Sequence, residues 1–371
     1  MRVLIAAGGT GGHIYPGLAV AQEIMRRNAS SVVEFVGTAR GLETKLVPAA
    51  GFKLLLIESS GLKNVGLAAR LKGLWLLPKS FLAARKLLKE FRPDVVIGAG
   101  GYVSGPVLLM ASRLGIPTLV MESNALPGFT NRQLARFVDK AAVTFDVTLP
   151  YFRGKGIVTG NPVRRVFFTI EPKQRDADTF SVLLFGGSQG ARAINQAMVA
   201  ALPLLAHEKA RFRITHQTGP HDFESVKQGY TDAGWQQRAD VRPYLENIVD
   251  NFAAADLIIC RAGATTTAEL IAAGKAALMI PFPQAADDHQ RKNAEALAEA
   301  GAARMILQPE LSGARLAQEL LELSDAPEII TQMETQARQL AKGDAAATTV
   351  DLLESSGQWS VVSKKKAVSS Q

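Results

Sequence analysis

Three glycine-rich loops stand out among the residues whose types and spacing could support chemistry. They span residues 8–12, 98–101 and 186–190, and each follows a short apolar run and precedes a segment of helical length. At a helix N-terminus the backbone N–H groups are unpaired and the helix dipole is positive, and glycine lets an anion approach the backbone. One such loop is as readily a simple tight turn, but three in equivalent positions favour phosphate binding.

The glycine spacing argues against two common nucleotide sites. A dinucleotide fingerprint, Gly-x-Gly-x-x-Gly, would need glycine at position 14 or 103, where the sequence has Ile14 and Val103. None of the three loops carries the Gly-Lys-Ser/Thr ending of a P-loop. Redox chemistry with NAD and ATP hydrolysis therefore lose support, while nucleotide-sugar transfer by paired α/β domains remains.

Length and composition set the class of protein. The chain has 371 residues, of which 47% are hydrophobic and 20% charged, and a single cysteine, Cys260. At ~100–200 residues per domain this length suggests two or three domains. One cysteine forms no internal disulfide and excludes a cysteine-based zinc site. Apolar runs fall short of the ~18–20 residues of a membrane span, and the N-terminus lacks a signal-peptide pattern, so we expect a cytoplasmic protein.

The excess positive charge is concentrated in one stretch. The net charge is +8, and residues 61–92 contain eight basic residues and one acidic residue, a local excess of +7. Leucines and a tryptophan interleave with these bases, a pattern typical of a helix lying on anionic lipid, although a core helix with a solvated charged face is the alternative. A local patch does not favour nucleic acid as a partner. The residues expected at the membrane are Lys72, Trp75, Lys79, Arg85 and Lys86.

The elements that must position the loops are short strands alternating with helices. The apolar runs are continuous, as expected for parallel strands covered on both faces. The predicted strands are residues 3–7, 32–36, 95–97, 119–121, 142–144, 182–185, 212–215, 257–260 and 277–280. Helical segments between them include residues 18–27, 106–113, 191–205 and 264–273. This alternation predicts a doubly wound α/β architecture.

The two halves of the chain repeat one pattern. Residues 5–12 and 183–190 each contain an apolar strand, two glycines, a hydroxyl residue, one further residue and a glycine. The repeat predicts two Rossmann-like domains of similar size. Their boundary is expected within residues 160–178, where proline, glycine and charge interrupt the pattern.

Taken in order, the motifs make the sequence similar to the MurG family. The matching segments are GGTGGHIYPG at residues 8–17, GAGGYVSGP at 98–106, GNPVR at 160–164, GGSQGAR at 186–192, RAGATTTAE at 261–269 and PFPQAADDHQRKN at 281–293. Each motif alone is weakly specific, but the ordered set is highly specific. One departure is Ser123, where the family usually has glutamine.

The resemblance implies a GT-B fold, with two Rossmann-like domains whose parallel sheets face a central cleft. The implied N-terminal acceptor and membrane-facing domain spans residues 1–162, and the UDP-GlcNAc-binding domain spans residues 163–340. Residues 341–358 are expected to form a C-terminal helix that packs back on the N-terminal domain. Residues 359–371 are expected to be a disordered basic tail.

The implied reaction is inverting transfer of GlcNAc from UDP-GlcNAc to the 4-hydroxyl of MurNAc in undecaprenyl-pyrophosphoryl-MurNAc-pentapeptide (lipid I), which gives lipid II for peptidoglycan synthesis. The resemblance implies neither a metal nor a cofactor. The expected location is peripheral, on the cytoplasmic face of the bacterial cell membrane. The expected partners are UDP-GlcNAc, lipid I, the anionic membrane surface, and other cell-wall synthesis and division proteins.

On the acceptor side, His13 is the candidate general base. An inverting transfer needs a group to take the proton of the attacking hydroxyl, and a histidine with a pKa near neutrality suits that role. The alternatives for His13 are ordering the loop or binding phosphate. The expected pyrophosphate ligands are Thr10 and the N–H groups of Gly9, Gly11 and Gly12, and further acceptor-side candidates are Asn124 and Tyr102.

On the donor side, the resemblance assigns Glu269 to the ribose hydroxyls, because a carboxylate can accept two hydrogen bonds side by side. Arg261 could balance phosphate charge or only hold its loop, and Asp288 is expected to be a helix N-cap. The remaining donor-side candidates are Arg164 and Ser188 for the phosphates, Leu245 for uracil, His289 and Gln290 for the sugar, and Thr265 and Thr266 beside Glu269.

Three other functions compete with this interpretation. One is a related GT-B transferase that acts on diacylglycerol, and the second is a nucleotide-sugar 2-epimerase, which needs no acceptor. The third is a non-catalytic nucleotide-sugar-binding module. The presence of His13, Glu269 and Gln290 together argues against a dead site.

Overall fold

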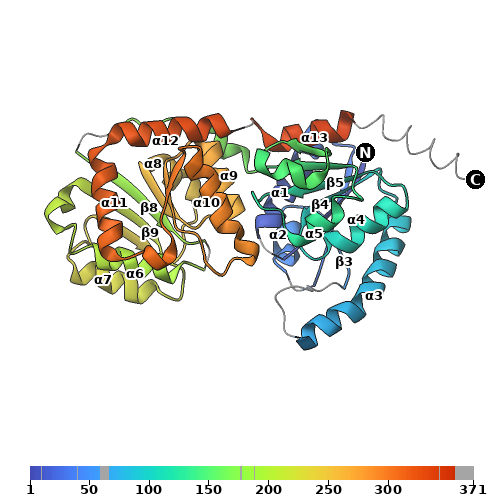
Figure 1. The fold of residues 1–371 in the computed structure, drawn as a ribbon, viewed down its shortest axis with the longest axis horizontal. Helices are drawn as coiled ribbons and strands as arrows, with labels where there is room; N and C mark the ends of the chain where they lie inside the picture. The colour runs from blue at the N-terminus through green and yellow to red at the C-terminus, as the bar shows by residue number, and fades with distance from the viewer. Residues whose placement is uncertain are drawn as a thin grey trace, which may run out of the picture. The chain divides into compact units, whose positions relative to one another are not determined.

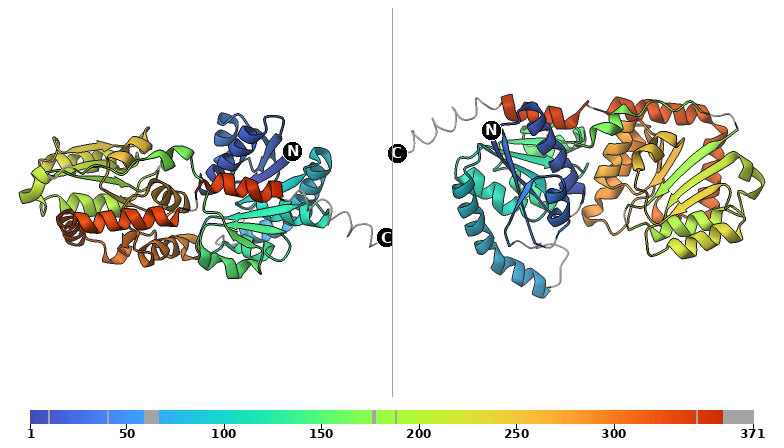
Figure 2. Two further views of the ribbon diagram at one scale, coloured as in Figure 1. Left: turned by 90° about the horizontal axis from the view of Figure 1, so that it is seen from above. Right: turned by 180° about the vertical axis from the view of Figure 1, so that it is seen from behind.

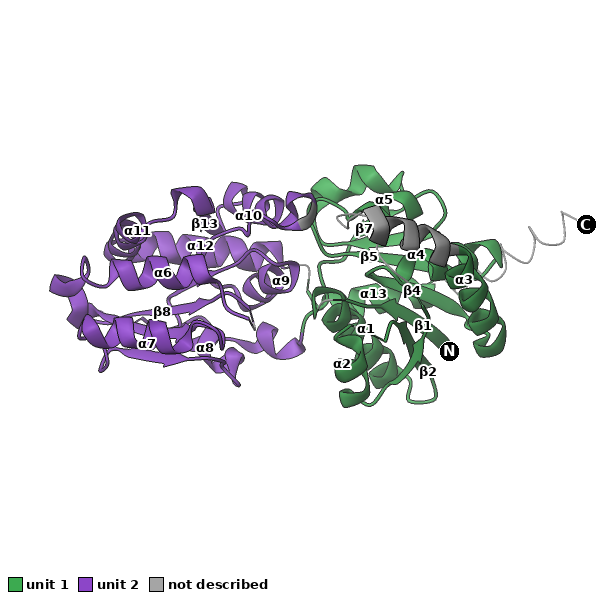
Figure 3. Ribbon diagram, turned by 90° about the horizontal axis from the view of Figure 1, so that it is seen from below, with its two compact units in different colours: residues 1–163, 342–371 green, residues 164–341 purple. Residues whose placement is uncertain are grey.

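Strands and helices alternate along the whole chain (Figure 1). The computed structural model describes residues 1–9, 11–39, 41–58, 67–175, 178–187, 189–341 and 343–355, without the side chains of 67–77 and 286. Helix α13 (Ala345–Glu354), near the C-terminal end, packs against α1 (Gly11–Arg27), near the N-terminal end (Figure 2). The chain consequently forms two compact units, one of Met1–Val163 with the segment from Lys342 onward and one of Arg164–Ala341 (Figure 3).

The first unit is built on a seven-stranded parallel sheet with the order β3-β2-β1-β4-β5-β6-β7. Its strands are β1 (Arg2–Ala7), β2 (Val32–Gly37), β3 (Lys53–Leu56), β4 (Val95–Gly100), β5 (Thr118–Glu122), β6 (Lys140–Val143) and β7 (Gly156–Val158). Its other helices are α2 (Glu43–Ala49), α3 (Leu67–Phe91), α4 (Ser104–Arg113), α5 (Phe129–Leu134) and the 3-10 helix η1 (Asp146–Phe152).

The second unit repeats this topology with six parallel strands in the order β10-β9-β8-β11-β12-β13. Its strands are β8 (Phe180–Phe185), β9 (Phe212–Gln217), β10 (Ala239–Arg242), β11 (Leu257–Cys260), β12 (Ala277–Met279) and β13 (Ala303–Met305). Its α-helices are α6 (Arg192–Ala201), α7 (Phe223–Asp232), α8 (Ile248–Ala254), α9 (Ala264–Ala273), α10 (His289–Glu299), α11 (Gly313–Asp325) and α12 (Pro327–Leu340). Its 3-10 helices are η2 (Arg165–Thr169), η3 (Ala206–Arg211), η4 (Ala286–Asp288) and η5 (Gln308–Glu310).

Alternate residues of each central strand pack on opposite faces of the sheet. In β1, Val3 and Ile5 join a core with residues of α1 and α13, whereas Leu4 and Ala6 join a core with residues of α3 and α4. Covering both faces is why these strands read as continuous apolar runs. The predicted doubly wound α/β class is confirmed, with every predicted strand present.

The structure differs from the sequence prediction at some boundaries. Helix α1 begins at Gly11, seven residues before the predicted start, so that His13 lies in its first turn. Glycine and Pro16 in this stretch hid the helix, because both are poor helix formers in isolation. Pro16 is the sixth residue of α1, where proline removes one intrahelical hydrogen bond, so the helix forms in spite of it.

Candidate functional site

The first two glycine loops lie together because of the strand order. Strands β1 and β4 are neighbours although α1, β2, α2, β3 and α3 separate them along the chain, which makes the space after them the topological switch point of the sheet. Ligands of open α/β sheets bind at this point. Gly101 approaches the Gly8 carbonyl so closely that a side chain at Gly101 would overlap it. The sequence predicted each loop separately, and the topology joins them.

His13 lies between these two loops. Its Nδ1 is 3.2 Å from the carbonyl oxygen of Gly8, and its ring lies against Gly100, where a Cβ would overlap it. Gly100 has a φ of +117°, which a residue with a side chain rarely adopts. The second loop therefore needs glycine at position 100 both for its backbone conformation and to accommodate the imidazole.

Glu43 anchors the first glycine loop by hydrogen bonding, a role that the sequence analysis missed. Its side chain is fully buried and accepts hydrogen bonds from the Gly9 N–H at 3.0 Å and from the Thr38 N–H and hydroxyl, both at 2.9 Å. Burial alone would raise the pKa of this carboxyl group, but the hydrogen bonds from Thr38 and Gly9 outweigh it, so the pKa lies below its ordinary value. Glu43 is thus an ionised acceptor at neutral pH.

Two predicted acceptor-side residues lie at the ends of neighbouring strands. Tyr102 follows β4 and is 55% exposed. Asn124 follows β5, and both its N–H and its side-chain amide donate to Glu122, at 3.0 and 3.1 Å. Glu122 also accepts from Asn131 at 2.9 Å, so it organises this loop although the sequence analysis gave it no role. Of the remaining acceptor candidates, Gly11 and Gly12 begin α1, and Thr10 lies outside the described residues. The Gly9 N–H, also expected to bind the pyrophosphate, donates to Glu43 instead.

The switch point of the second unit falls between β8 and β11. The third glycine loop follows β8, and Ser188 within it lies outside the described residues. Gln217, at the end of β9, donates to the Gly187 carbonyl at 2.9 Å and accepts from the Leu245 N–H at 2.9 Å. Gln217 therefore ties the glycine loop to the segment expected to bind uracil. Because the Leu245 N–H is already used, a base contact at Leu245 would have to use its carbonyl, which narrows the prediction made for this residue.

Glu269 lies on α9, directly after β11. Its carboxylate is 3.6 Å from the guanidinium of Arg164, which also stacks on Phe167. Burial raises the pKa of Glu269 to about 7, and Arg164 opposes that rise. In the first turn of α9, the hydroxyl of Thr265 is buried and has no hydrogen-bond partner, and Thr266 follows it. An unsatisfied buried hydroxyl beside a carboxylate of raised pKa on one helix is a combination of the kind that binding sites contain.

The loop after β12 is held by residues predicted to touch the donor. Gln290, at the start of α10 beside His289, accepts from the Phe282 N–H at 3.0 Å. Arg261 donates to the carbonyls of Ile280 and Pro281, so it holds this loop, the second of the two roles considered for it.

Asp288 lies at the expected position but does not act as a side-chain cap. It occupies the N-cap position of α10 but makes no side-chain cap hydrogen bond, because its backbone is left-handed with a φ of 54°. An N-cap side chain reaches the helix N–H groups from an extended backbone instead.

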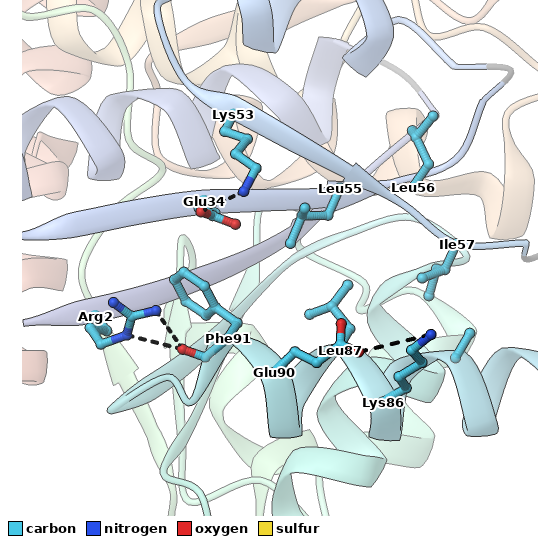
Figure 4. Close-up of a pocket in the computed structure, with 11 residues that line it drawn as sticks. Arg2, Glu34, Lys53, Leu55, Leu56, Ile57, Lys86, Leu87, Glu90 and Phe91 are labelled. Carbon is cyan, nitrogen blue, oxygen red and sulfur yellow. Dashed lines mark hydrogen bonds and ion pairs between the residues drawn. The ribbon is translucent and has the colours of Figure 1, made fainter.

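The predicted membrane segment is largely α3. Its inner face packs through Ala84, Leu88 and Phe91, whereas Lys79, Arg85 and Lys86 are exposed on the outer face. This is the core helix with a solvated charged face that the sequence offered as the alternative, and docking of that face on a membrane stays a prediction. The side chains of Lys72 and Trp75 lie outside the described ones. A cavity of about 490 Å³ separates α3 from the edge strand β3, and no described glycine-loop residue lines it (Figure 4).

None of the described helices is both long and apolar enough to span a membrane. No group of three or more histidine, cysteine or acidic side chains within the described ranges is placed to hold a metal ion.

Comparison with known proteins identifies the family. Residues 3–143 match the glycosyltransferase family 28 N-terminal domain, and residues 181–349 match the family 28 C-terminal domain. Proteins of Citrifermentans bemidjiense and Geobacter sulfurreducens, both named UDP-N-acetylglucosamine–N-acetylmuramyl-(pentapeptide) pyrophosphoryl-undecaprenol N-acetylglucosamine transferase, are each 46% identical over 356 residues. These matches cover 95% of this chain and 99% and 97% of the two relatives.

Solved structures agree. The crystal structure of Acinetobacter baumannii MurG has a TM-score of 0.80 at 33% identity, covering 95% of this chain and 99% of that one. The UDP-GlcNAc 2-epimerase of Neisseria meningitidis, bound to UDP-GlcNAc, has a TM-score of 0.66 at 15% identity over 95% of this chain and 98% of that one, which is a likeness of fold alone. The chain therefore belongs to glycosyltransferase family 28 and, within it, to the MurG family.

Proposed function

We propose that this chain transfers GlcNAc from UDP-GlcNAc to the 4-hydroxyl of MurNAc in lipid I, with inversion at the anomeric carbon, and so makes lipid II. The observation that carries the proposal is the identity of 46% over 95% of the chain with the transferases that are named for this reaction. The two sets of loop residues at the two switch points supply a site for each substrate.

In the first unit, His13 acts as the general base. As the 4-hydroxyl oxygen forms its bond to the anomeric carbon, the hydroxyl proton moves to the imidazole. The bond between the anomeric carbon and the β-phosphate oxygen of the donor breaks, and UDP is the leaving group. The N–H groups at the start of α1 favour the acceptor pyrophosphate, because they are unpaired and at the positive end of the helix dipole.

In the second unit, Glu269 accepts hydrogen bonds from the ribose hydroxyls. Arg164 lies close enough to favour the ionised form of this carboxyl group. The glycine loop after β8 holds the diphosphate, and Gln217 fixes the distance between this loop and the base-binding segment. Thr265 supplies a buried hydroxyl that a sugar or phosphate oxygen can satisfy.

The exposed basic face of α3 holds the enzyme on the cytoplasmic face of the membrane. Lys79, Arg85 and Lys86 alternate there with Leu82, which is 66% exposed. Basic side chains attract anionic headgroups, and an exposed leucine among them can enter the headgroup boundary. This placement suits an acceptor that carries a polyprenyl chain.

The test is transfer of labelled GlcNAc from UDP-GlcNAc to a short-chain lipid I analogue, in EDTA. We expect a disaccharide product with a β linkage, together with one UDP for each transfer. Diacylglycerol in place of lipid I should give no product. Formation of UDP-ManNAc without an acceptor would instead indicate an epimerase, and UDP-GlcNAc binding without turnover would indicate a non-catalytic module.

A further inference from the structure

A single peptide group joins Glu43 to His13. The Gly9 N–H donates to Oε2 of Glu43 at 3.0 Å, and the Gly8 carbonyl, which belongs to the same peptide group, lies 3.2 Å from Nδ1 of His13. In a planar trans peptide the N–H and the C=O point in opposite directions. The carboxylate and the imidazole therefore lie on opposite sides of one rigid unit.

This arrangement selects the tautomer of His13. A carbonyl oxygen can only accept a hydrogen bond, so the contact with Gly8 requires the proton on Nδ1. In the neutral ring the other nitrogen, Nε2, then carries the lone pair. A general base at this position must take the acceptor proton on Nε2, so the Gly8 carbonyl determines whether His13 can act.

The surroundings of Glu43 fix the position of the Gly8 carbonyl. Glu43 reaches the peptide from α2, and a side chain at Gly41 or Gly37 would overlap it, so the surrounding backbone is shaped to this carboxylate. Thr38 occupies its second oxygen with two hydrogen bonds. A hydrogen bond to an ionised acceptor is about twice as strong as a neutral one, and it polarises the peptide so that its carbonyl accepts more strongly.

We propose that Glu43 is a positioning residue for the reaction, which fixes the tautomer and orientation of His13 through the peptide group between Gly8 and Gly9. The proposal rests on the function proposed for His13. It assigns Glu43 no contact with either substrate. A purely structural role for Glu43 would stabilise the loop but would leave the tautomer of His13 unchanged.

The decisive variant is Glu43→Gln, which keeps the shape of the side chain. Its amide has one acceptor oxygen, and Thr38 presents two donors to that position whereas Gly9 presents one. The oxygen should stay with Thr38, which turns the amide nitrogen toward the Gly9 N–H and breaks the link. The tautomer of His13 is read directly from the imidazole ¹⁵N shifts, with the signal assigned by its loss in His13→Ala.

We expect the Nδ1–H tautomer in the wild type and a mixture with Nε2–H in Glu43→Gln. The kcat should fall by about 10- to 100-fold, the range seen when the hydrogen-bond partners that orient metal-binding histidines are removed. The Kd for UDP-GlcNAc should not change, because the donor residues belong to the other unit. The matched control is Glu23→Gln, another buried carboxylate of this unit, which pairs with Arg26 and Arg27 on α1. It should keep the wild-type tautomer and kcat.

A wild-type His13 with its proton on Nε2, or a Glu43→Gln protein with an unchanged tautomer, would overturn the proposal. If Glu43→Gln does not fold, Glu43→Asp, whose shorter side chain draws the carboxylate away from the Gly9 N–H, is read by the same ¹⁵N shifts and should give the same mixture of tautomers. The failure of the underlying function is separate, because His13→Ala with full turnover would remove the general base while the ¹⁵N result still reports the effect of Glu43.

Discussion

His13 is the residue whose removal should separate chemistry from binding. The variant His13→Ala loses the imidazole between the two glycine loops of the first unit. Loss of a general base typically lowers kcat by ~10²–10⁴-fold. The Kd for UDP-GlcNAc, measured by calorimetry, should stay at the wild-type value. Near-full turnover, or a loss confined to donor affinity, would assign His13 to another role.

Glu269 should govern the affinity for the donor. In Glu269→Ala the ribose hydroxyls lose a charged acceptor, and hydrogen bonds to charged groups contribute about 1.5–3 kcal/mol, which corresponds to roughly 10- to 100-fold in Kd. Calorimetry with UDP-GlcNAc measures the effect directly. A donor affinity equal to that of the wild type would exclude Glu269 from the site.

The raised pKa of Glu269 makes donor binding depend on pH. Burial brings this pKa to about 7, so the carboxyl group gains a proton as the pH falls through neutrality. The protonated form accepts hydrogen bonds more weakly, so the affinity for UDP-GlcNAc should decrease below pH 7, by at most tenfold for each pH unit. Titrations at pH 6, 7 and 8 test this. Glu269→Gln should show no such slope, and a slope that persists in that variant would have to come from another group.

Sequence motifs could identify the residues proposed to face a substrate but not the residues that position the substrate-binding loops. His13, Glu269 and Gln290 lie in recognisable motifs. Glu43 and Gln217 are distant in the sequence from the loops to which they are hydrogen-bonded. Glu43 is 34 residues from Gly9, and Gln217 is 30 residues from Gly187. Their roles depend on strand order, which brings distant loops together. A buried carboxylate or amide with several backbone partners is recognisable only in three dimensions.

At the scale of elements, Gln217 should couple the glycine loop after β8 to the segment containing Leu245. Gln217→Leu leaves the Leu245 N–H and the Gly187 carbonyl without this partner, and the buried Leu245 N–H left unsatisfied costs about 1–3 kcal/mol. We expect a lower melting temperature and a higher KM for UDP-GlcNAc, with an unchanged KM for the acceptor. Gln228→Leu, which removes an exposed glutamine of α7, is the control and should behave as the wild type. An unchanged donor KM in Gln217→Leu would show that the link serves stability alone.

The strands that the sequence analysis missed share one property. They are β3, β7, β10 and β13, the four edge strands of the two sheets. A central strand is covered on both faces and reads as a continuous apolar run, but an edge strand is short and partly exposed. In β10 (Ala239–Arg242), half-buried and exposed residues alternate. Such a sequence resembles a loop, and only pairing with β9 makes it a strand.

At the scale of the whole molecule, the charge on α3 should decide where the enzyme works. Each basic residue near an anionic bilayer contributes about 1 kcal/mol, so Lys79→Glu with Arg85→Glu should weaken binding to anionic vesicles by at least about 30-fold. Sedimentation with vesicles measures this. Turnover of a short-chain acceptor should survive, whereas turnover of long-chain lipid I in vesicles should fall.

The matched control for this prediction is Arg213→Glu with Lys227→Glu, which changes the charge equally on exposed residues of the second unit. It should bind vesicles like the wild type. Equal losses in both double variants would show that net charge, rather than the α3 surface, drives the attraction. Unchanged vesicle binding by the α3 variant would place membrane docking elsewhere.

The packing of α13 on α1 has a consequence for the order in which a ribosome can complete this protein. Val350 and Leu353 belong to the core of the first unit, and Arg27 of α1 donates to Asp351 and Glu354 of α13. The first 163 residues therefore emerge without the helix that covers α1. At ~5–20 residues per second, synthesis of the intervening unit takes on the order of 10–40 s. During that interval the apolar surface of α1 stays uncovered, so the first domain to be translated is the last to be finished.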